Sequence, residues 1–183
     1  GLSKILDLIE PSPDCIHFEN LSGLSSRIVL ITTADPDIKE ADRQISAHIP
    51  VDSVVLHTSG ALSSDELSVL RNGGIAVGSI HPLASVSDPI LGSKSFSGAY
   101  FFVLCDPIAV QTAESLVRNL GGASFTVEAR FKPLYHAGAV MAAGHVVALI
   151  DAAIGVLSEC GIEPDVAKRV LLPLIESSVA NLK

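Results

Sequence analysis

The stretch from Lys132 to Asp151 reads KPLYHAGAVMAAGHVVALID, and it divides the chain into two kinds of sequence. Proline at its second position suits the first turn of a helix, where the missing N–H costs no hydrogen bond. Lys132 and His136 stand four residues apart, so they share one face of that helix. The small residues that follow them would allow another backbone to approach closely. The stretch is therefore either a core helix with a polar end or the wall of a site.

Strand and helix patterns alternate on the N-terminal side of this stretch. Helix starts are indicated at Asp35, an expected N-cap, at the Ser63 capping box and at Asp106-Pro107. Between them lie apolar runs that predict strands, at residues 27–32, 52–57, 75–80, 98–104 and 124–127. The alternation predicts an α/β fold: a partial Rossmann-like, mainly parallel sheet that lacks its first βαβ unit.

On the C-terminal side the sequence contains no strand candidate. One long helix is expected to about Cys160 and a second from Pro164, which predicts an α/β domain at 1–128 and a helical domain at 129–183. A further short helix is expected at Leu2–Ile9, before two prolines. The chain starts and stops within helical patterns, as a piece of a longer protein would.

Composition limits the classes of function. The 183 residues are 48% apolar and 17% charged, which is enough for a packed core, and the net charge is −8. No basic field is present to bind nucleic acid or an anionic membrane. Three separated cysteines form no CxxC pair, which favours a reducing, cytoplasmic setting. The apolar run Ala137–Ile150 is too short to span a bilayer, so we expect a soluble protein.

Polar residues follow the predicted strands, where ligands bind in open α/β sheets. His57 and Ser59 follow the second strand and His81 follows the third, so these side chains are candidates for substrate contacts. Each of them could equally be a turn residue or a satisfied structural side chain. Asp35, by contrast, is fully explained as a helix cap.

Several catalytic and cofactor fingerprints are missing from the sequence. It contains no GxGxxG, no GxxxxGK[ST], no GxSxG and no HExxH. The histidines could converge in space to bind a metal, but their spacing alone does not indicate this, and no metal ligand is predicted. Cofactor binding thus cannot be argued from a motif.

Lys132 and His136 are the strongest candidate pair. A cation beside an imidazole can polarise a carbonyl oxygen and exchange a proton with it, as hydride transfer at a carbonyl or imine carbon requires. The alternative is a lysine at a domain rim and a histidine bonded to a backbone carbonyl. We expect the pair to face a crevice between the domains.

Three segments resemble a known group of proteins: VVLHTSGALSSDEL, GGIAVGSIHPLASVSD and KPLYHAGAVMAAGHVVALIDAA. They are similar to Rossmann-like oxidoreductases that join a dinucleotide-binding domain to a helical domain of unknown function. The group is related more distantly to pyrroline-5-carboxylate reductase and to the 6-phosphogluconate dehydrogenase superfamily. The resemblance spans about Arg27 to Leu182.

The resemblance implies an NAD or NADP cofactor, whose glycine-rich loop would precede Gly1. It places Thr32, Thr33, Ala34 and Thr58 beside that cofactor, with Lys132 and His136 as catalytic groups. His145, where the superfamily leads us to expect an asparagine, joins the expected substrate contacts. In that superfamily the helical domain usually forms a homodimer.

Two hypotheses follow, and the sequence leaves open whether the chain is catalytic. The first is an NAD(P)-dependent oxidoreductase of unknown small-molecule substrate, or a fragment of one. The second is a non-catalytic dimerisation or ligand-binding module derived from the same fold.

Overall fold

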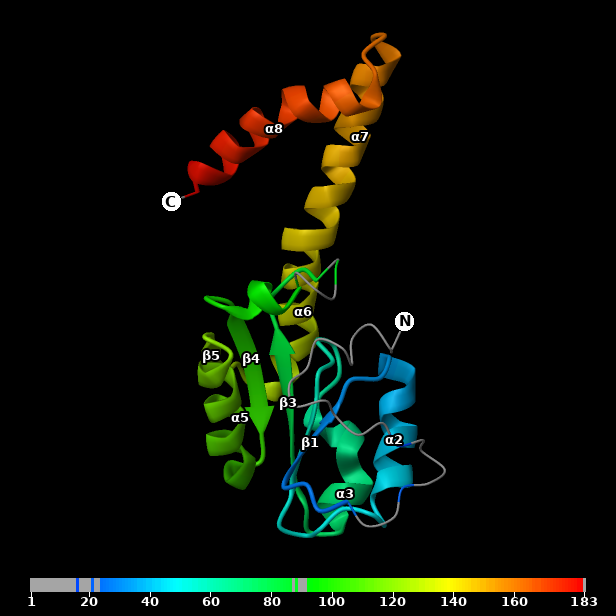
Figure 1. Ribbon diagram of the computed structural model, residues 1–183, viewed down its shortest axis with the longest axis vertical. Coiled ribbons are helices and arrows are strands. Elements are labelled where there is room, and N and C mark those ends of the chain that lie inside the picture. The colour runs from blue at the N-terminus through cyan, green and yellow to red at the C-terminus, as the bar shows by residue number, and fades with distance from the viewer. Residues whose placement is uncertain (1–15, 17–20, 22–23, 87, 89–91, 183) are drawn as a thin grey trace. The chain divides into compact units, whose positions relative to one another are not determined.

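The computed structural model describes residues 16, 21, 24–86, 88 and 92–182 (Figure 1). The chain forms two compact units, residues 1–136 and 137–183, and each is described by itself. They meet between His136 and Ala137, within a helix, whereas the boundary predicted near Glu128 precedes that helix. The helix expected at Leu2–Ile9 lies outside the described residues.

The first unit is built on a five-stranded sheet in the order β1-β2-β3-β4-β5. Its strands are β1 (Ile28–Ile31), β2 (Val54–His57), β3 (Ala76–Pro82), β4 (Tyr100–Cys105) and β5 (Ala123–Phe125). The predicted α/β class and Rossmann-like sheet are thus confirmed, and the five strands expected between residues 27 and 127 are present. β3 extends beyond its predicted end and includes His81.

One pairing departs from a parallel sheet: β3 and β4 are antiparallel, whereas β1–β2, β2–β3 and β4–β5 are parallel. A parallel return needs a crossover of about a dozen residues or more, usually a helix. Among its described residues, the segment between β3 and β4 offers only the short 3₁₀ turn η4 (Ser93–Phe96). The chain therefore turns back beside β3 in the opposite direction.

Helices cover both faces of this sheet (Figure 1). The 3₁₀ turn η2 (Asp35–Asp37) leads into α2 (Ile38–Ile45), and η3 (Ser64–Leu67) leads into α3 (Ser68–Asn72). These pack on one face and form a core with Val55 and Val77. On the other face, α5 (Pro107–Asn119) packs its alanines and Val117 against Val54, Leu56 and Phe101. β2 is buried along its whole length because it contributes to both cores.

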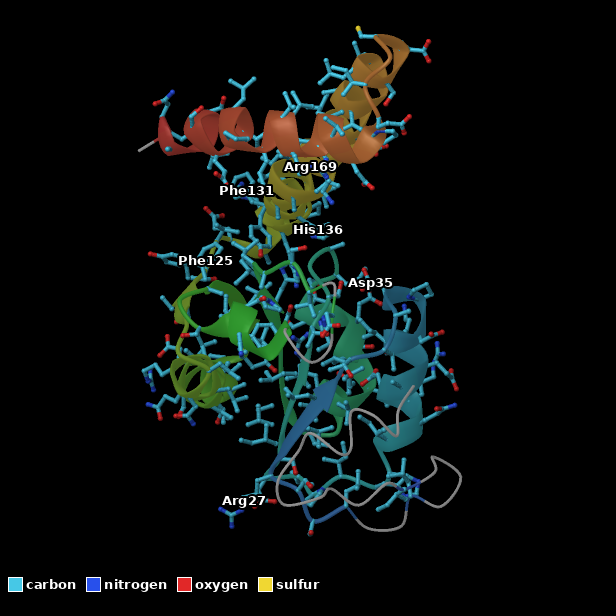
Figure 2. All side chains as sticks on the ribbon, turned by 45° about the horizontal axis from the view of Figure 1, so that its top comes forward. Arg27, Asp35, Phe125, Phe131, His136 and Arg169 are labelled. Carbon is cyan, nitrogen blue, oxygen red and sulfur yellow. The ribbon has the colours of Figure 1, made fainter. Side chains whose placement is uncertain are left out.

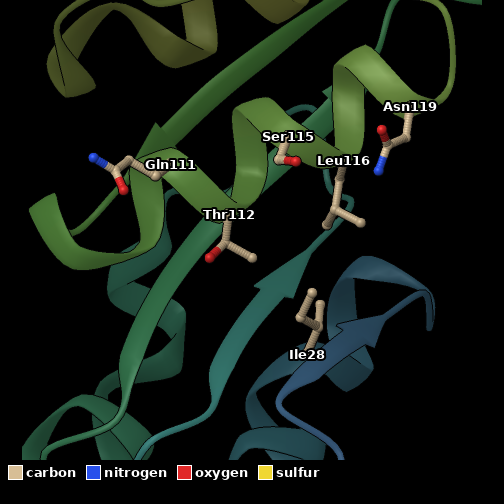
Figure 3. Close-up of a pocket in the computed structure, with 6 residues that line it drawn as sticks. All are labelled: Ile28, Gln111, Thr112, Ser115, Leu116 and Asn119. Atoms are coloured by element: carbon tan, nitrogen blue, oxygen red, sulfur yellow. The ribbon is translucent and has the colours of Figure 1, made fainter.

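β1 forms an edge of the sheet, and its α5 side is only partly covered. Ile28 is 42% exposed and Leu30 49% exposed, while Ile31 faces the opposite core. A shallow groove of about 290 Å³ runs between Ile28 and α5 (Figure 3). Polar and apolar side chains of that helix line it: Gln111, Thr112, Ser115, Leu116 and Asn119. This surface carries no charged side chain in its lining.

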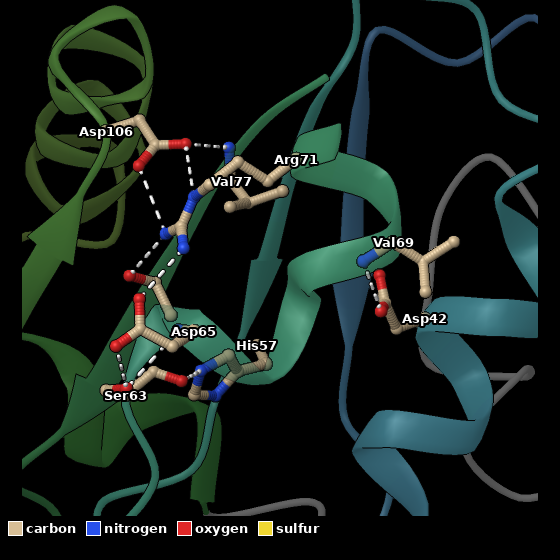
Figure 4. Close-up of polar contacts among 9 residues, drawn as sticks. Asp42, His57, Ser63, Asp65, Val69, Arg71, Val77 and Asp106 are labelled. Carbon is tan, nitrogen blue, oxygen red and sulfur yellow. Dashed lines mark hydrogen bonds and ion pairs between the residues drawn. The ribbon is translucent and has the colours of Figure 1, made fainter. Parts of the chain in front are cut away.

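Polar contacts tie the helices to the sheet (Figure 4). Arg71 of α3 makes an ion pair with Asp106, at the start of α5, at 3.1 Å and a second with Asp65 at 2.8 Å. Asp106 also accepts the backbone N–H of Val77 at 3.2 Å. One carboxylate thus joins a helix start, a strand and a neighbouring helix.

Asp42 performs a capping role that its sequence neighbours do not suggest. It is fully buried on α2, and its two carboxylate oxygens accept the N–H groups of Val69 and Leu70 at 2.9 and 3.0 Å. We expect Asp42→Ala to lower the free energy of unfolding by about 2 kcal/mol, because two buried donors would lose their acceptor. Glu40→Ala, on the exposed side of the same helix, should change it by less than about 0.5 kcal/mol. Urea unfolding of both variants checks this, and equal losses would contradict it.

The second unit consists of helices. The 3₁₀ turn η5 (Ala129–Phe131) and the first part of α6 (Lys132–Val140) belong to the first unit. In the second unit the helix continues from Ala137 through a π-helical turn (Met141–His145) into α7 (Val146–Glu159), and α8 (Pro164–Ala180) packs against α7. The helix Ala129–Glu159 is long and apolar enough, by length and composition alone, to cross a membrane, and its most apolar window is unburied. The prediction that this segment is too short to span a bilayer was wrong, because it considered only residues 137–150 and the helix extends past both ends of that run.

Candidate functional site

The site is set by strand register at the carboxyl ends of β2 and β3. His57 pairs with Ser79, and His81 pairs with Phe102 of the antiparallel β4. Side chains paired across strands share a face of the sheet, and so do residues two apart. These four side chains therefore project from the face that α2 and α3 cover. The first turn of α6 supplies the residues that pack against them.

His57 is a structural histidine in this arrangement (Figure 4). It is fully buried, its Nε2 lies 3.0 Å from the carbonyl oxygen of Ser63, and its Nδ1 accepts the Ser59 N–H at 3.2 Å. Only the Nε2–H tautomer satisfies both contacts. Burial, and then the nearby Lys132 charge, lower the pKa of His57 to about 4, so the ring stays neutral. His57 therefore holds the HTSG loop (residues 57–60) in place. Its expected contact with a substrate stays a prediction.

Ser59 shapes the same loop. Its Oγ accepts the N–H groups of Ala61 and Leu62 at 3.2 and 3.0 Å, and its carbonyl oxygen accepts the Ser79 hydroxyl at 3.3 Å. The side chain is buried, with 5% exposure. Ser59 is therefore placed beside the site as a turn residue, and the expected substrate contact remains untested.

Lys132 lies at the centre of the cluster and has no exposed surface. Its Nζ donates a hydrogen bond to Ser79 Oγ and stands 5.1 Å from the centre of the Phe102 ring, a cation–π contact. Burial lowers the pKa of Lys132 to about 8, although the carboxylate of Asp35 opposes the shift. Lys132 is enclosed by its neighbours, and the expectation that it faces a crevice between the domains stays a prediction. Its amine acts on its neighbours through its charge.

His81 and Tyr135 form a second part of the site. His81 Nδ1 lies 2.7 Å from the Tyr135 hydroxyl, and the Tyr135 ring stacks on Phe102 with 4.6 Å between centroids. Burial, followed by the charges of His136 and Lys132, lowers the pKa of His81 to about 4. Burial raises the pKa of Tyr135 to about 12. At neutral pH, then, an uncharged imidazole meets a protonated phenol.

His136 packs edge to face with His81, with 5.7 Å between ring centroids. Its Nδ1 is buried and has no hydrogen-bond partner among the described residues. A Cβ placed on Gly60 would lie 2.3 Å from this Nδ1 and 2.7 Å from His81 Nε2. Only a glycine at position 60 lets both rings approach the loop this closely. Lys132 and His136 are thus brought into one cluster, as expected, together with His81.

Asp35 belongs to this region, although its sequence pattern suggested a helix cap. The N-cap position is Ala34, and no side chain caps the turn that begins at Asp35. Instead its negative charge partly opposes the lowering of the pKa values of His57, His81 and Lys132. In Figure 2, Asp35 and His136 lie at the same end of the first unit. The prediction of Asp35 as N-cap was wrong, because the helix starts with a 3₁₀ turn that includes it.

The residues expected beside a cofactor lie on the loops after β1 and β2. Thr32, Thr33 and Ala34 are exposed and Thr58 is half-buried. His145 is exposed and belongs to the second unit, and its expected contact with a substrate stays a prediction. Among the described residues no three histidine, cysteine, aspartate or glutamate side chains converge as metal ligands.

Three members of the cluster escaped the sequence argument: Ser79, Tyr135 and Gly60. Ser79 had a usable signal, since it is a hydroxyl inside an apolar strand. Tyr135 stands three residues after Lys132, on the same helical face, and the KxxYHA motif includes it. The role of Gly60 could not be recognised from the sequence, because the HTSG motif alone does not show which aromatic rings pack on the loop.

The sequence and the fold were compared with those of known proteins. Residues 99–183 match the model of a domain of unknown function, DUF2520. No curated protein matches the sequence. Among solved structures, protein TM1727 of Thermotoga maritima is 23% identical, with a TM-score of 0.67 over 85% of this chain and 60% of that one.

Two enzymes of named activity have similar structures. Plasmodium falciparum pyrroline carboxylate reductase with NADP bound is 15% identical, with a TM-score of 0.64 over 84% of this chain and 56% of that one. Prephenate dehydrogenase of Aquifex aeolicus is 16% identical, with a TM-score of 0.61 over 90% and 60%. The chain has the fold of nicotinamide-dependent oxidoreductases. It spans less than two thirds of each of these proteins.

The resemblance predicted from three sequence segments is therefore confirmed at the level of fold. It is also confirmed for the C-terminal part, which matches a domain of unknown function.

Proposed function

We propose that this chain is part of an NAD(P)-dependent oxidoreductase that acts on a carbonyl or imine carbon of a small molecule. The observation that carries the proposal is the cluster around Lys132. A buried amine, two imidazoles and a phenol meet at the strand ends of a sheet whose fold is that of nicotinamide-dependent enzymes. Perturbed titratable groups of this kind are typical of catalytic sites.

The residues present fit a nicotinamide cofactor in part. When bound, the cofactor would supply or accept the hydride. The hydroxyls of Thr32, Thr33 and Thr58 and the backbone at Ala34 would hold its polar groups, since they follow two adjacent parallel strands. The sequence has no glycine-rich phosphate loop, so the phosphates need donors from outside these motifs.

In the proposed reaction each side chain has a distinct part. His81 and His136 present ring nitrogens for the reacting oxygen or nitrogen and for its proton. Burial is the main reason that His81 stays neutral, and the positive charge of Lys132 adds to it and favours negative charge that develops nearby. Ser79 holds the Lys132 amine, and His57 and Ser59 hold the loop that carries Gly60.

The second unit supports the proposal of a homodimer. Large apolar side chains along α7 and α8 are exposed, among them Val147 at 65%, Leu149 at 71%, Val156 at 65% and Leu174 at 62%. A helix that is apolar around its circumference needs cover on more than one side. We propose that a second copy provides it, in a soluble cytoplasmic enzyme that binds neither nucleic acid nor membrane. A protein that is monomeric in solution and binds to lipid vesicles would contradict the proposal of a homodimer.

The alternative is a non-catalytic ligand-binding or dimerisation module of the same fold. Full burial of Lys132 favours it. Titration of the full-length protein with NADPH and NADH, followed by cofactor fluorescence and thermal shift, separates the two. Binding of either supports the enzyme. Binding of neither would end that proposal and leave the module.

The site itself has a direct test once turnover is found. Lys132→Ala and His136→Ala should each reduce kcat/KM at least about tenfold, because each removes charge or proton transfer from the reacting atoms. Lys168→Ala, at an exposed lysine of α8, is the matched control and should retain full activity. Unchanged turnover in both site variants would refute their roles.

A further inference from the structure

We infer that Tyr135 is a positioning residue that fixes the proton of His81 on Nε2, so that His81 enters the site as a hydrogen-bond donor. The hydroxyl and His81 Nδ1 are 2.7 Å apart, a short and strong contact. A neutral imidazole has one donor and one acceptor nitrogen, so the direction of this bond decides what Nε2 can do.

Two directions are possible for the bond. If Nδ1–H donated to the phenol oxygen, the Tyr135 hydroxyl proton would need another acceptor, and none is found among the described residues. If the hydroxyl donates to Nδ1, one bond satisfies both groups, and the remaining N–H is on Nε2. An imidazole nitrogen is also a better acceptor than a phenol oxygen. The second direction therefore leaves fewer polar groups without a partner.

The surroundings keep both partners in the required charge state. The Tyr135 ring is held by stacking on Phe102 and by an edge contact with Phe125, 5.7 Å between centroids. That packing aims the hydroxyl at His81. Burial, and then the charges of His136 and Lys132, lower the pKa of His81, and burial raises the pKa of Tyr135, so neither group changes its protonation near pH 7.

The consequence concerns the proposed reaction. His81 Nε2 has no hydrogen-bond partner among the described residues and points toward Gly60 and His136. An Nε2–H there can donate to an oxygen or nitrogen lone pair of a substrate and stabilise charge on it, as a neutral electrophile. This role rests on the proposed oxidoreductase function, whereas the position of the proton does not.

The tautomer can be measured without substrate or cofactor. In ¹⁵N-labelled protein at pH 7, long-range ¹H–¹⁵N spectra distinguish an Nε2–H from an Nδ1–H imidazole, and His81→Gln assigns the His81 signals among the six histidines. The wild type should show His81 as the Nε2–H tautomer. Tyr135→Phe, which keeps the ring and its stacking, should give a mixture of tautomers.

The control is the other tyrosine of the chain, Tyr100, which is 59% exposed on β4. Tyr100→Phe should leave the His81 tautomer unchanged. An Nδ1–H tautomer in the wild type, or an unaltered tautomer in Tyr135→Phe, would overturn the inference. Should Tyr135→Phe fail to fold, the wild-type spectrum decides alone. Because no cofactor is added, failure here leaves the NADPH titration as an independent test.

Discussion

Lys132→Met is expected to be more stable than the wild type at pH 7, and this advantage should be smaller at pH 10. In the wild type, the folded state disfavours a buried ammonium, and burial lowers the pKa of Lys132 from 10.5 to about 8. Methionine has a similar length, no charge and no donor that needs a partner. The variant therefore removes this cost while it keeps the packing against Phe102.

The direction of the pH effect follows from proton counts. Between pH 8 and 10.5 the unfolded lysine still binds its proton while the folded amine has lost it. Unfolding then takes up a proton, so the stability of the wild type rises with pH through this window and the cost is full below pH 8. The advantage of Lys132→Met should shrink by about 3 kcal/mol across the window.

The comparison must be between two proteins, because other groups titrate in the same range. Burial raises the pKa of Cys105 to about 11 and that of Tyr135 to about 12, and both lower stability as pH rises above their unfolded values. These contributions are present in both wild type and variant and cancel in the difference, apart from the smaller effect of the Lys132 charge on the pKa of Cys105. Urea unfolding at pH 7, 8, 9 and 10 measures this difference. The stability of Lys168→Met should change with pH in the same way as that of the wild type. If the stability of Lys132→Met also did so, the pKa of the Lys132 amine would not be perturbed.

Much of the first unit could be predicted because its local signals agree. Apolar runs such as 52–57 mark buried strands, and Asp106-Pro107 marks the start of α5 where the structure has it. The direction of β4 could not be predicted from its own residues. It depends on the preceding segment, whose described residues form no long crossover helix, and the pattern of β4 is the same in either direction.

The site was predicted in its location more than in its roles. Polar residues after strands, and two basic residues on one helical face, correctly brought Lys132, His136 and His81 together. The sequence could not show that both nitrogens of His57 bond to backbone atoms, or that Lys132 is covered. Such facts depend on loop conformation and on contacts between residues far apart in the chain.

Gly60→Ala tests the packing of the two histidines most severely. The added methyl group would lie 2.3 Å from His136 Nδ1 and 2.7 Å from His81 Nε2, well inside van der Waals contact. At least one ring must move. We expect a loss of about 1–3 kcal/mol in the free energy of unfolding, typical of an overpacked interior, and at least a tenfold loss of any turnover.

Gly155→Ala is the matched control for this substitution. Nothing lies within 4 Å of a Cβ at Gly155, in the interior of α7, so alanine there should stabilise the protein by about 0.5–1 kcal/mol. The decisive measurement is a double-mutant cycle with His136→Ala, which removes the ring that the new methyl group meets. Gly60→Ala should cost clearly less in that background, because only the contact with His81 Nε2 would remain. Additive effects of the two substitutions would mean that the loop and the His136 ring are not in contact, and the site as described here would then be wrong.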